Sequence, residues 1–537
     1  MKLTRTSIKK RKPWEAAAVT LPAFDIDAMI TRTLESPCWV HFGPGNIFRG
    51  FIAGLMQTLL NKGRAGCGVI AAGNEIIDKI YRPHDNLSLL VTLNADGTSG
   101  REVIASIADS LKADFHNSDI EKLKWIFRQS SLQMVSLTIT EKGYELRDMQ
   151  GDLLPAVEND MRQGPGAPSQ TMSILTALML ERWQNGAAPV ALVSMDNCSK
   201  NGDKLRSSVL AVAGAWEEKG FAPEGFVDWL ADETKVSFPW TMIDKITPRP
   251  SETIETQLRE DGIEDMSVVV TGRNSYIAPF VNAEAPQYLV VEDAFPNGRP
   301  ALEEAGVYFT DRTTVNDTER MKVTTCLNPL HTALAVFGCL LGYTSISDEM
   351  KDRDLKKLVE LIGYGEGMPV VTDPKIIDPS AFIKEVIEVR FPNPFIPDTP
   401  QRIATDTSQK IPIRFGETIK AYIAHDELDV KSLVGIPLAI AAWLRYLLGI
   451  DDEGKPFEVS GDPLLPQLRR QLAPIVFGDP QSYRGQLAPI LSNPVLFAAD
   501  LTACGLSDKI ETMFVRMLEG PGAVRNTLGL YLRDKLV

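Results

Sequence analysis

One segment constrains the fold of this chain more than any other: a short apolar run that ends in glycines and continues as a helical pattern. Residues 38–42 form the apolar run, Gly43 and Gly45 interrupt it, and residues 47–60 carry apolar side chains at helical spacing. A second apolar run follows at residues 67–72. Strand, glycine turn, helix and strand in this order predict the opening βαβ unit of a doubly wound sheet.

The pattern continues and then changes along the chain. Further buried strands are predicted at residues 89–93, 134–140, 190–195 and 268–270, with helices such as 171–182 and 205–218 between them. From about Thr324 helical periodicity dominates, including a long stretch at residues 488–518. We therefore predict an α/β, Rossmann-like, doubly wound domain over residues 1–310, beginning with an irregular arm at residues 1–35. A mostly α-helical domain is predicted over residues 311–537.

Composition and charge argue against several classes of protein. The formal net charge is -14, which disfavours nucleic acid as a partner because phosphate contacts need a basic surface. The six cysteines form no CxxC pair and suit a reducing compartment, and the histidines show no metal-ligand spacing. The basic N-terminus lacks the apolar core of a secretory signal, and the longest apolar stretches are too short or too polar to span a bilayer. We expect a cytoplasmic monomer or small homo-oligomer that uses no metal and binds no membrane.

The glycine segment has the features of a dinucleotide-binding turn. Glycines after a strand let the backbone approach a pyrophosphate, and the first N–H groups of the next helix bind anionic oxygens. An acidic residue after the second strand would bind the adenosine ribose, and Glu75 is the best candidate. The alternatives are an ordinary strand-to-helix turn and a solvated carboxylate.

A second candidate site surrounds Lys322. A dehydrogenase without a metal needs a group that exchanges the alcohol proton, and a desolvated lysine can act as that base. Asn328 and His331 are three residues apart and would share one face of a helix. Alternatively, Asn328 is the N-cap of a helix that begins at Pro329, and His331 is a core histidine.

Two further polar segments could contact a substrate. Asp196 and Asn197 follow an apolar strand, at the edge where α/β sheets bind ligands. Asn197 could donate a hydrogen bond to an alkoxide, and Asp196 could cap the next helix. Residues 402–410 form a polar loop with two cations, which suits an anion or a polyol but also an ordinary surface loop.

Together these segments resemble the polyol-specific long-chain dehydrogenases, the mannitol dehydrogenase and fructuronate reductase family. The likeness extends from about residue 38 to about residue 420. The family's GxGxFxR, TxTEKGY, DN, VDRITP-like, ED-x-F…RP and RI…D-x-S-x-K motifs match residues 43–49, 138–144, 196–197, 243–248, 292–300 and 402–410, respectively. Its K…N-x-x-H motif falls on Lys322, Asn328 and His331.

The spacing of this last motif departs from the family. Six steps separate Lys322 from Asn328, where the family usually has five. On one regular helix the extra step would rotate the lysine by ~100°. Because Asn328 and Pro329 indicate the start of a helix, we expect Lys322 on a preceding non-helical stretch in which a bulge absorbs the extra residue.

The resemblance implies an NAD(H)-dependent oxidoreductase, with NADP as the alternative cofactor, that interconverts a keto sugar acid and its alditol acid. Lys322 would be the general acid/base, Asn197 and Asn328 would hold the alkoxide, and His331 would orient the reacting oxygen. Asp244 would support the site electrostatically, Glu141 would line a proton path, Arg402 would reach the substrate, and Lys410 would reach the substrate or the cofactor. The expected cofactor contacts are Gly43, Gly45, Asn46, Ile47, Phe48, Arg49 and Glu75.

The resemblance also orders the candidate substrates. D-fructuronate and D-mannonate are the first choice, and mannitol 2-dehydrogenase and tagaturonate reductase are the alternatives. A substrate carboxylate needs a dedicated cation, for which Arg249, Arg402 and Arg414 are candidates. Two other classes remain as remote alternatives: a metal-dependent sugar-acid isomerase or epimerase, and a nucleotide-sensing protein without catalytic activity.

Overall fold

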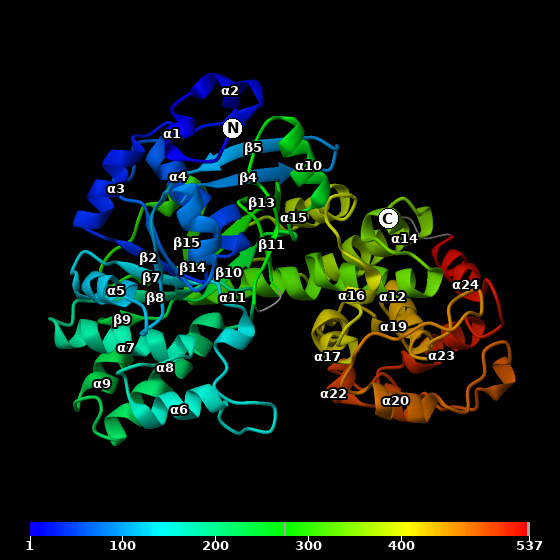
Figure 1. Cartoon of the computed structure of the whole chain (residues 1–537). Coiled ribbons are helices and arrows are strands. Elements are labelled where there is room, and N and C mark those ends of the chain that lie inside the picture. The colour runs from blue at the N-terminus through cyan, green and yellow to red at the C-terminus, as the bar shows by residue number, and fades with distance from the viewer. Residues whose placement is uncertain (273–274, 534–537) are drawn as a thin grey trace. The chain divides into compact units, whose positions relative to one another are not determined.

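The computed structural model describes residues 1–272 and 275–533, which divide into two compact units at Asn316 and Asp317 (Figure 1). The first unit is built on a six-stranded parallel sheet of order β6-β3-β2-β7-β8-β9. Its strands are β2 (Trp39–Phe42), β3 (Val69–Gly73), β6 (Ile107–Lys112), β7 (Met134–Leu137), β8 (Val190–Ser194) and β9 (Val236–Ser237). Numbered along the chain, the order is 3-2-1-4-5-6. This is the doubly wound nucleotide-binding arrangement, so the predicted fold class is confirmed.

The strands of this sheet are apolar runs because both of its faces are covered. Alternate residues of each strand enter two different cores: Val40 and Phe42 join one, and Trp39 joins the other. The first core lies between the sheet and a group of helices that Figure 1 shows together on one side of it. These helices are α5 (Asp119–Arg128), α6 (Pro155–Gln163), α7 (Thr171–Gln184), α8 (Asn201–Glu218) and α9 (Phe226–Ala231). The second core includes α4 (Ala53–Asn61).

The N-terminal segment is not the irregular arm that we predicted. It contains α1 (Arg5–Ile8), α2 (Arg11–Ala16) and α3 (Ile26–Glu35). The Asp25 side chain caps α3 by accepting a hydrogen bond from the Ala28 N–H, at 3.0 Å. Trp14 is fully buried and Met29 nearly so. Capping and burial therefore order a segment in which no long periodic pattern is visible.

Two predicted strands belong to other sheets. The strand β4 (Ser88–Leu93) lies in a four-stranded sheet with β1 (Val19–Thr20), β5 (Ser99–Ile104) and β13 (Phe280–Glu284). The strand β11 (Val269–Val270) forms a two-stranded sheet with β12 (Tyr276–Ile277), and Val270 is exposed. A further sheet contains β10 (Thr241–Asp244), β14 (Tyr288–Glu292) and β15 (Tyr308–Thr310). The short helix α10 (Glu252–Glu260) also belongs to this unit.

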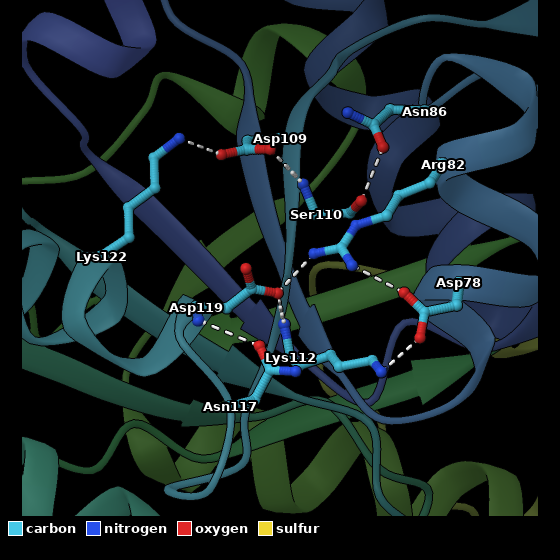
Figure 2. A network of polar contacts seen from close by, with 9 residues as sticks. All are labelled: Asp78, Arg82, Asn86, Asp109, Ser110, Lys112, Asn117, Asp119 and Lys122. Carbon is cyan, nitrogen blue, oxygen red and sulfur yellow. Dashed lines mark hydrogen bonds and ion pairs between the residues drawn. The ribbon is translucent and has the colours of Figure 1, made fainter.

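The sequence did not predict β6, which lies at one edge of the parallel sheet. Charged groups surround it (Figure 2): Lys122 pairs with Asp109 at 2.5 Å, and Arg82 pairs with Asp78 at 2.6 Å and also with Asp119. Charges along an edge strand oppose its pairing with another chain. Lys112, the last residue of β6, pairs with Asp78 and so connects the π-helical turn η2 (Ile77–Tyr81) to the sheet.

The second unit is helical, and its described residues add only two isolated β-bridges. Its centre is formed by α12 (Asn328–Leu341) and α19 (Gly435–Tyr446), and all residues of α19 are buried. The helical run 312–341 is long and apolar enough to cross a membrane, but 72% of its most apolar window is buried inside the protein, as in a core helix. Residues 488–518 form α21 (Ala488–Leu491), α22 (Pro494–Phe497) and α23 (Ser507–Arg516) rather than one helix. The remaining helices are α11 (Arg312–Met321), α13 (Ile346–Glu349), α14 (Arg353–Glu360), α15 (Pro379–Glu385), α16 (Pro400–Ile403), α17 (Thr407–Ile411), α18 (Glu417–Ala424), α20 (Leu465–Leu472) and α24 (Ala523–Leu532).

A buried carboxylate caps the start of the central helix α19. The Glu366 side chain accepts hydrogen bonds from the backbone N–H groups of Val434, Gly435 and Ile436, at 2.6, 2.7 and 2.8 Å. These N–H groups have no partner within the helix, so the carboxylate satisfies donors that burial would otherwise leave unpaired. Burial raises the pKa of Glu366, and the three backbone hydrogen bonds oppose that rise.

Candidate active site

The glycine turn after β2 opens onto a pocket of about 430 Å³. Gly43 and Gly45 line it together with Thr138 and Thr140, which follow β7. The strand order reverses between the neighbouring strands β2 and β7, and doubly wound sheets bind nucleotides at this point. The pocket is therefore the candidate cofactor site of the first unit.

The backbone of the turn fits the diphosphate of a dinucleotide. Gly43 has φ +80°, and a Cβ placed there would lie 2.1 Å from the Thr138 carbonyl oxygen. A Cβ on Gly73 would lie 2.8 Å from Cδ of Pro44. Glycine at both positions keeps the turn close to its neighbours, and a continuous helical stretch, residues 46–61, begins directly after it.

Two side chains that the sequence analysis did not single out hold this turn. The Tyr81 hydroxyl donates a hydrogen bond to the Pro44 carbonyl oxygen at 2.8 Å. The His41 ring lies 2.7 Å from Ser136 Oγ and 2.8 Å from Thr138 Oγ1. Burial lowers the pKa of His41 to about 3, so the ring is neutral. These partners are distant in sequence from the turn, and no local motif marks them.

Residues 46–49 lie behind the turn and not along the pocket. Arg49 is fully buried and donates hydrogen bonds to the Ala278 carbonyl oxygen at 2.6 Å and to Asn46 Oδ1 at 2.9 Å. Phe48 is also fully buried and stacks on His41, with 4.1 Å between the ring centroids. Ile47 is half-buried against the same core. The structure gives these four residues a supporting position, whereas Gly43, Gly45 and Glu75 line the pocket.

Glu75 lies at the rim of this pocket, two residues after β3. Its Oε1 accepts a hydrogen bond from the Gly272 N–H at 2.9 Å, and its Oε2 lies 2.7 Å from Lys79 Nζ. The side chain is about one-third exposed, at 38%. These contacts fix a carboxylate beside the space where the ribose of a dinucleotide would be held.

Asp196 connects two motifs that are far apart in the sequence. Its carboxylate accepts hydrogen bonds from the Ile139 and Thr140 N–H groups, both at 2.9 Å, and from the Tyr144 hydroxyl at 2.6 Å. It therefore holds the loop after β7, and the prediction that it caps the next helix is wrong. Asn197 is the next residue and is exposed. Its position at the carboxyl end of β8 is thus set by the Asp196 contacts.

Two other residues expected at the site also lie in the first unit. Asp244 is the last residue of β10 and is buried. Glu141 is exposed and forms an ion pair with Lys204. Asn201 connects the loop of Asp196 to β10, because its side-chain amide donates to the Asp196 carbonyl oxygen at 3.0 Å and to Thr241 Oγ1 at 2.8 Å.

Lys322 lies in a π-helical turn, η6 (Lys322–Cys326), between α11 and α12. The prediction of a non-helical stretch is therefore wrong, although the predicted bulge is present, because a π-turn accommodates one residue more than an α-helical turn. Lys322 is buried, at 1% exposure. Asn328 is the first residue of α12 and Leu327 occupies the N-cap position, so Asn328 is not the cap.

His331 lies one turn into α12 and is surrounded by cations. Burial, together with the charges of Arg390, Arg402, Lys410 and Arg414, lowers the pKa of His331 to about 3. The ring is therefore neutral, and its buried Nε2 has no hydrogen-bond partner among the described residues. Asp398 Oδ2 is 3.4 Å from Nε2, and Asp398 is also the partner of Arg402.

The segment 402–410 is not the loop that we predicted, since it includes parts of the short helices α16 and α17. Lys410 Nζ donates a hydrogen bond to the Ile403 carbonyl oxygen at 3.2 Å and another to that of Thr405. Burial, followed by the charge of Arg414, lowers the pKa of Lys410 to about 8. Arg402 is mostly exposed, at 64%.

Arg414 was one of three candidates for a carboxylate-binding cation. It lies in the π-helical turn η10 (Pro412–Gly416), and its Nη1 donates a hydrogen bond to Thr332 Oγ1 at 2.6 Å. Burial lowers the pKa of Arg414 to about 10. No carboxylate pairs with it in the part of the chain that the structure describes. Arg249 lies in the first unit, over the ring of Tyr276.

The two units match two family models along almost their whole length. Residues 38–304 match the mannitol dehydrogenase Rossmann domain, and residues 314–516 match the mannitol dehydrogenase C-terminal domain. The D-mannonate oxidoreductase of Thermotoga maritima is 54% identical over 98% of both chains. A mannitol 2-dehydrogenase of Aspergillus fumigatus is 31% identical over 87% of this chain and 88% of its own.

Solved structures of two dehydrogenases also align with nearly the whole chain. The ternary complex of Pseudomonas fluorescens mannitol 2-dehydrogenase with NAD and D-mannitol aligns with a TM-score of 0.71 at 27% identity, covering 100% of both chains. A substrate-free D-sorbitol dehydrogenase aligns with a TM-score of 0.80 at 26% identity, covering 98% of this chain and 100% of its own. These matches confirm the resemblance inferred from the sequence motifs, and the chain belongs to the mannitol dehydrogenase family.

Proposed function

We propose that this protein is an NAD-dependent oxidoreductase that reduces D-fructuronate to D-mannonate and catalyses the reverse oxidation. The relative that is 54% identical is a D-mannonate oxidoreductase, which supports a sugar acid as substrate. The mannitol 2-dehydrogenase complex with NAD supports the cofactor. Within this chain, the observation that carries the choice of an acid is the group of cations around His331.

These cations favour an anionic substrate over a neutral polyol. Arg402, Lys410 and Arg414 all act on His331, and Asp398 lies beside the ring and pairs with Arg402. Arg414 is half-buried without a carboxylate partner among the described residues, and a partly desolvated cation without such a partner is costly. A substrate carboxylate would offset this cost through charge-assisted hydrogen bonds, which the hydroxyls of mannitol match less well.

The first unit would hold the cofactor. The backbone at Gly43 and Gly45 and the following helix would bind the diphosphate, and Glu75 would bind the adenosine ribose hydroxyls. A carboxylate there favours NAD, because it would repel the 2′-phosphate of NADP. When bound, the nicotinamide ring supplies or accepts the hydride of the reaction.

The protein's own side chains would handle the proton and the oxygen. In the reductive direction Lys322 donates a proton to the substrate carbonyl oxygen, and in the oxidative direction it removes the proton from the hydroxyl. The amides of Asn197 and Asn328 donate hydrogen bonds that stabilise negative charge on that oxygen. His331 is neutral, so its unpartnered Nε2 can orient a substrate hydroxyl without adding charge. Asp244 would support the site electrostatically, and Glu141 would line the proton path to solvent.

We place this enzyme in the cytoplasm, as a monomer or a small homo-oligomer. All six cysteines are free thiols, which suits a reducing compartment. The formal net charge of -14 disfavours nucleic acid as a partner.

A panel of keto substrates tests the proposed function. The oxidation of NADH is followed with D-fructuronate, D-tagaturonate and D-fructose, and D-fructuronate should give the highest kcat/KM. A preference for D-fructose would contradict the choice of a sugar acid. Cofactor binding without turnover of any substrate would favour a nucleotide sensor, and loss of activity on adding a chelator would favour a metal-dependent enzyme.

Replacing Arg414 by methionine should weaken the binding of the acid selectively. We expect the KM for D-mannonate to rise by about 10- to 100-fold, because a hydrogen bond between charged groups is lost. The KM for D-mannitol should change much less. Thr332→Val removes the 2.6 Å hydrogen bond between Arg414 and Thr332 and keeps the cation. It therefore distinguishes binding of the substrate carboxylate from a structural role of Arg414. The exposed Arg470 supplies the control, Arg470→Met. Equal losses for both substrates would contradict a carboxylate-binding role.

The affinity for D-mannonate should also depend on pH through Lys410. Its pKa is lowered to about 8 by burial and by Arg414 and Arg402, while Asp406 and Asp462 oppose the shift. Below this pH the ammonium is charged, and as the pH rises through about 8 the charge is lost. The ratio of the KM values for D-mannonate and D-mannitol should therefore rise above pH 8. Lys410→Arg keeps the charge and should flatten the profile.

A further inference from the structure

Two cysteines in the first unit lie side by side without being bonded covalently. Cys38 directly precedes β2, and Cys67 lies two residues before β3. These strands are parallel neighbours, with Val40 opposite Ile70, so their amino-terminal ends come together. The two thiols share a hydrogen bond. Both side chains are half-buried, so reagents in solution can reach the pair.

The surroundings of the pair distinguish its two sulfurs. The hydrogen bond from Cys38, with a contribution from the charge of Arg32, lowers the pKa of Cys67 to about 7. The same hydrogen bond and burial raise the pKa of Cys38. Cys67 is therefore the more readily ionised thiol of the pair, and the thiolate is the nucleophilic form of cysteine. Cys67 Sγ is also 3.7 Å from the Ser36 carbonyl oxygen.

Cys326, Cys339 and Cys504 lack these features. Cys326 and Cys339 are buried, and burial raises the pKa of each to about 12. Cys504 is half-buried, but its pKa is also raised by burial. Buried thiols of this kind are inert. Cys504 therefore provides a matched control for a partly exposed thiol that has no second sulfur as partner among the described residues.

We propose that Cys38 and Cys67 form a redox-modifiable pair that low-molecular-weight disulfides such as oxidised glutathione convert to a disulfide bond. The Cys67 thiolate attacks one sulfur of the small disulfide, which forms a mixed disulfide and releases one small thiolate. The Cys38 thiol then loses its proton and attacks Cys67 Sγ, which releases the second small thiol. The two cysteines lose two electrons and two protons, and the small disulfide gains them and becomes two thiols.

The position of the pair predicts what the disulfide would change. It lies at the amino-terminal ends of β2 and β3, whereas the glycine turn and Glu75 follow their carboxyl ends. The bond would join strands that carry the cofactor pocket without entering it. It would close a loop of about 30 residues and so restrict the unfolded chain. We expect a higher melting temperature and nearly unchanged turnover.

The full-length protein is incubated with oxidised glutathione, and its intact mass and free thiols are measured. The wild type should lose the mass of two hydrogen atoms and keep four of its six free thiols. Its Tm should rise by several degrees and return after reduction with dithiothreitol. Digestion without reduction should yield a linked peptide that contains Cys38 and Cys67.

Variants separate the two chemical steps. Cys38→Ser should stop at the mixed disulfide and keep one glutathionyl group on Cys67, whereas Cys67→Ser should acquire neither bond. Cys504→Ser should behave as the wild type does. Six reactive thiols in the treated wild type, or a stable mixed disulfide in it, would overturn the proposal. The linked peptide is measured in the wild-type protein, so this test of the disulfide does not depend on whether any variant folds.

Discussion

Replacing Lys322 by alanine should lower kcat by about 10²- to 10⁴-fold, because the reaction then loses the group that exchanges the substrate proton. The loss should appear equally in kcat/KM, as expected for an interaction made in the transition state. NAD binding should persist, since the proposed cofactor pocket is formed by other residues. Stopped-flow and steady-state assays of NADH oxidation with D-fructuronate measure both quantities.

The burial of Lys322 requires a control for folding. Alanine leaves a cavity at a position that is 1% exposed, so Lys322→Met, which keeps most of the side-chain volume, should be compared with it. Lys420→Met is the matched control, because this lysine is 51% exposed and pairs with Glu417 on the surface. Near-normal turnover in a folded Lys322→Met variant would move the proton-transfer role to another group, and Lys410 would be tested next.

The largest loss of stability is expected from Glu366→Leu. This change leaves three buried N–H groups at the start of α19 without an acceptor, and each buried unsatisfied donor costs about 1–3 kcal/mol. Because losses at adjacent groups are not additive, we expect a total of about 3–5 kcal/mol. Urea denaturation followed by circular dichroism measures the change in the free energy of unfolding.

Two further variants show whether the loss comes from the cap. Glu366→Gln keeps one acceptor oxygen and should lose less stability than Glu366→Leu. Glu458→Leu removes an exposed carboxylate and should have little effect. If Glu366→Leu unfolded with the wild-type midpoint and slope, solvent would have to reach the three N–H groups, which contradicts their burial.

The sequence predicted those helices and strands that depend on consecutive residues alone. The apolar run, the glycine turn and the helix after it lie within some twenty consecutive residues, so β2 and α4 were both visible in the sequence. The edge strand β6 was not, because Asp109 and Lys112 interrupt its apolar residues. Its ion pairs with Asp78 and Lys122 explain why charge is tolerated there.

Sequence motifs also predicted only part of the candidate site. The motifs identified Lys322, Asn328 and His331 as a group, but no motif revealed that Tyr81 holds Pro44. Asp196 has a carboxylate near a helix, which predicts a cap, yet its partners are in another motif more than fifty residues away. Contacts between distant segments are set by the tertiary fold, and spacing along one segment does not encode them.

The π-turn at Lys322 has a consequence for how this site can change over time. Because the turn holds a surplus residue, deletion of Val323 would let α11 and α12 merge into one regular α-helix and would restore the family spacing of five. Because the bulge already absorbs that residue, the helices on both sides of the deletion would keep their side-chain register. A single codon can thus be gained or lost at this turn without re-aiming the amine that we propose as the proton donor.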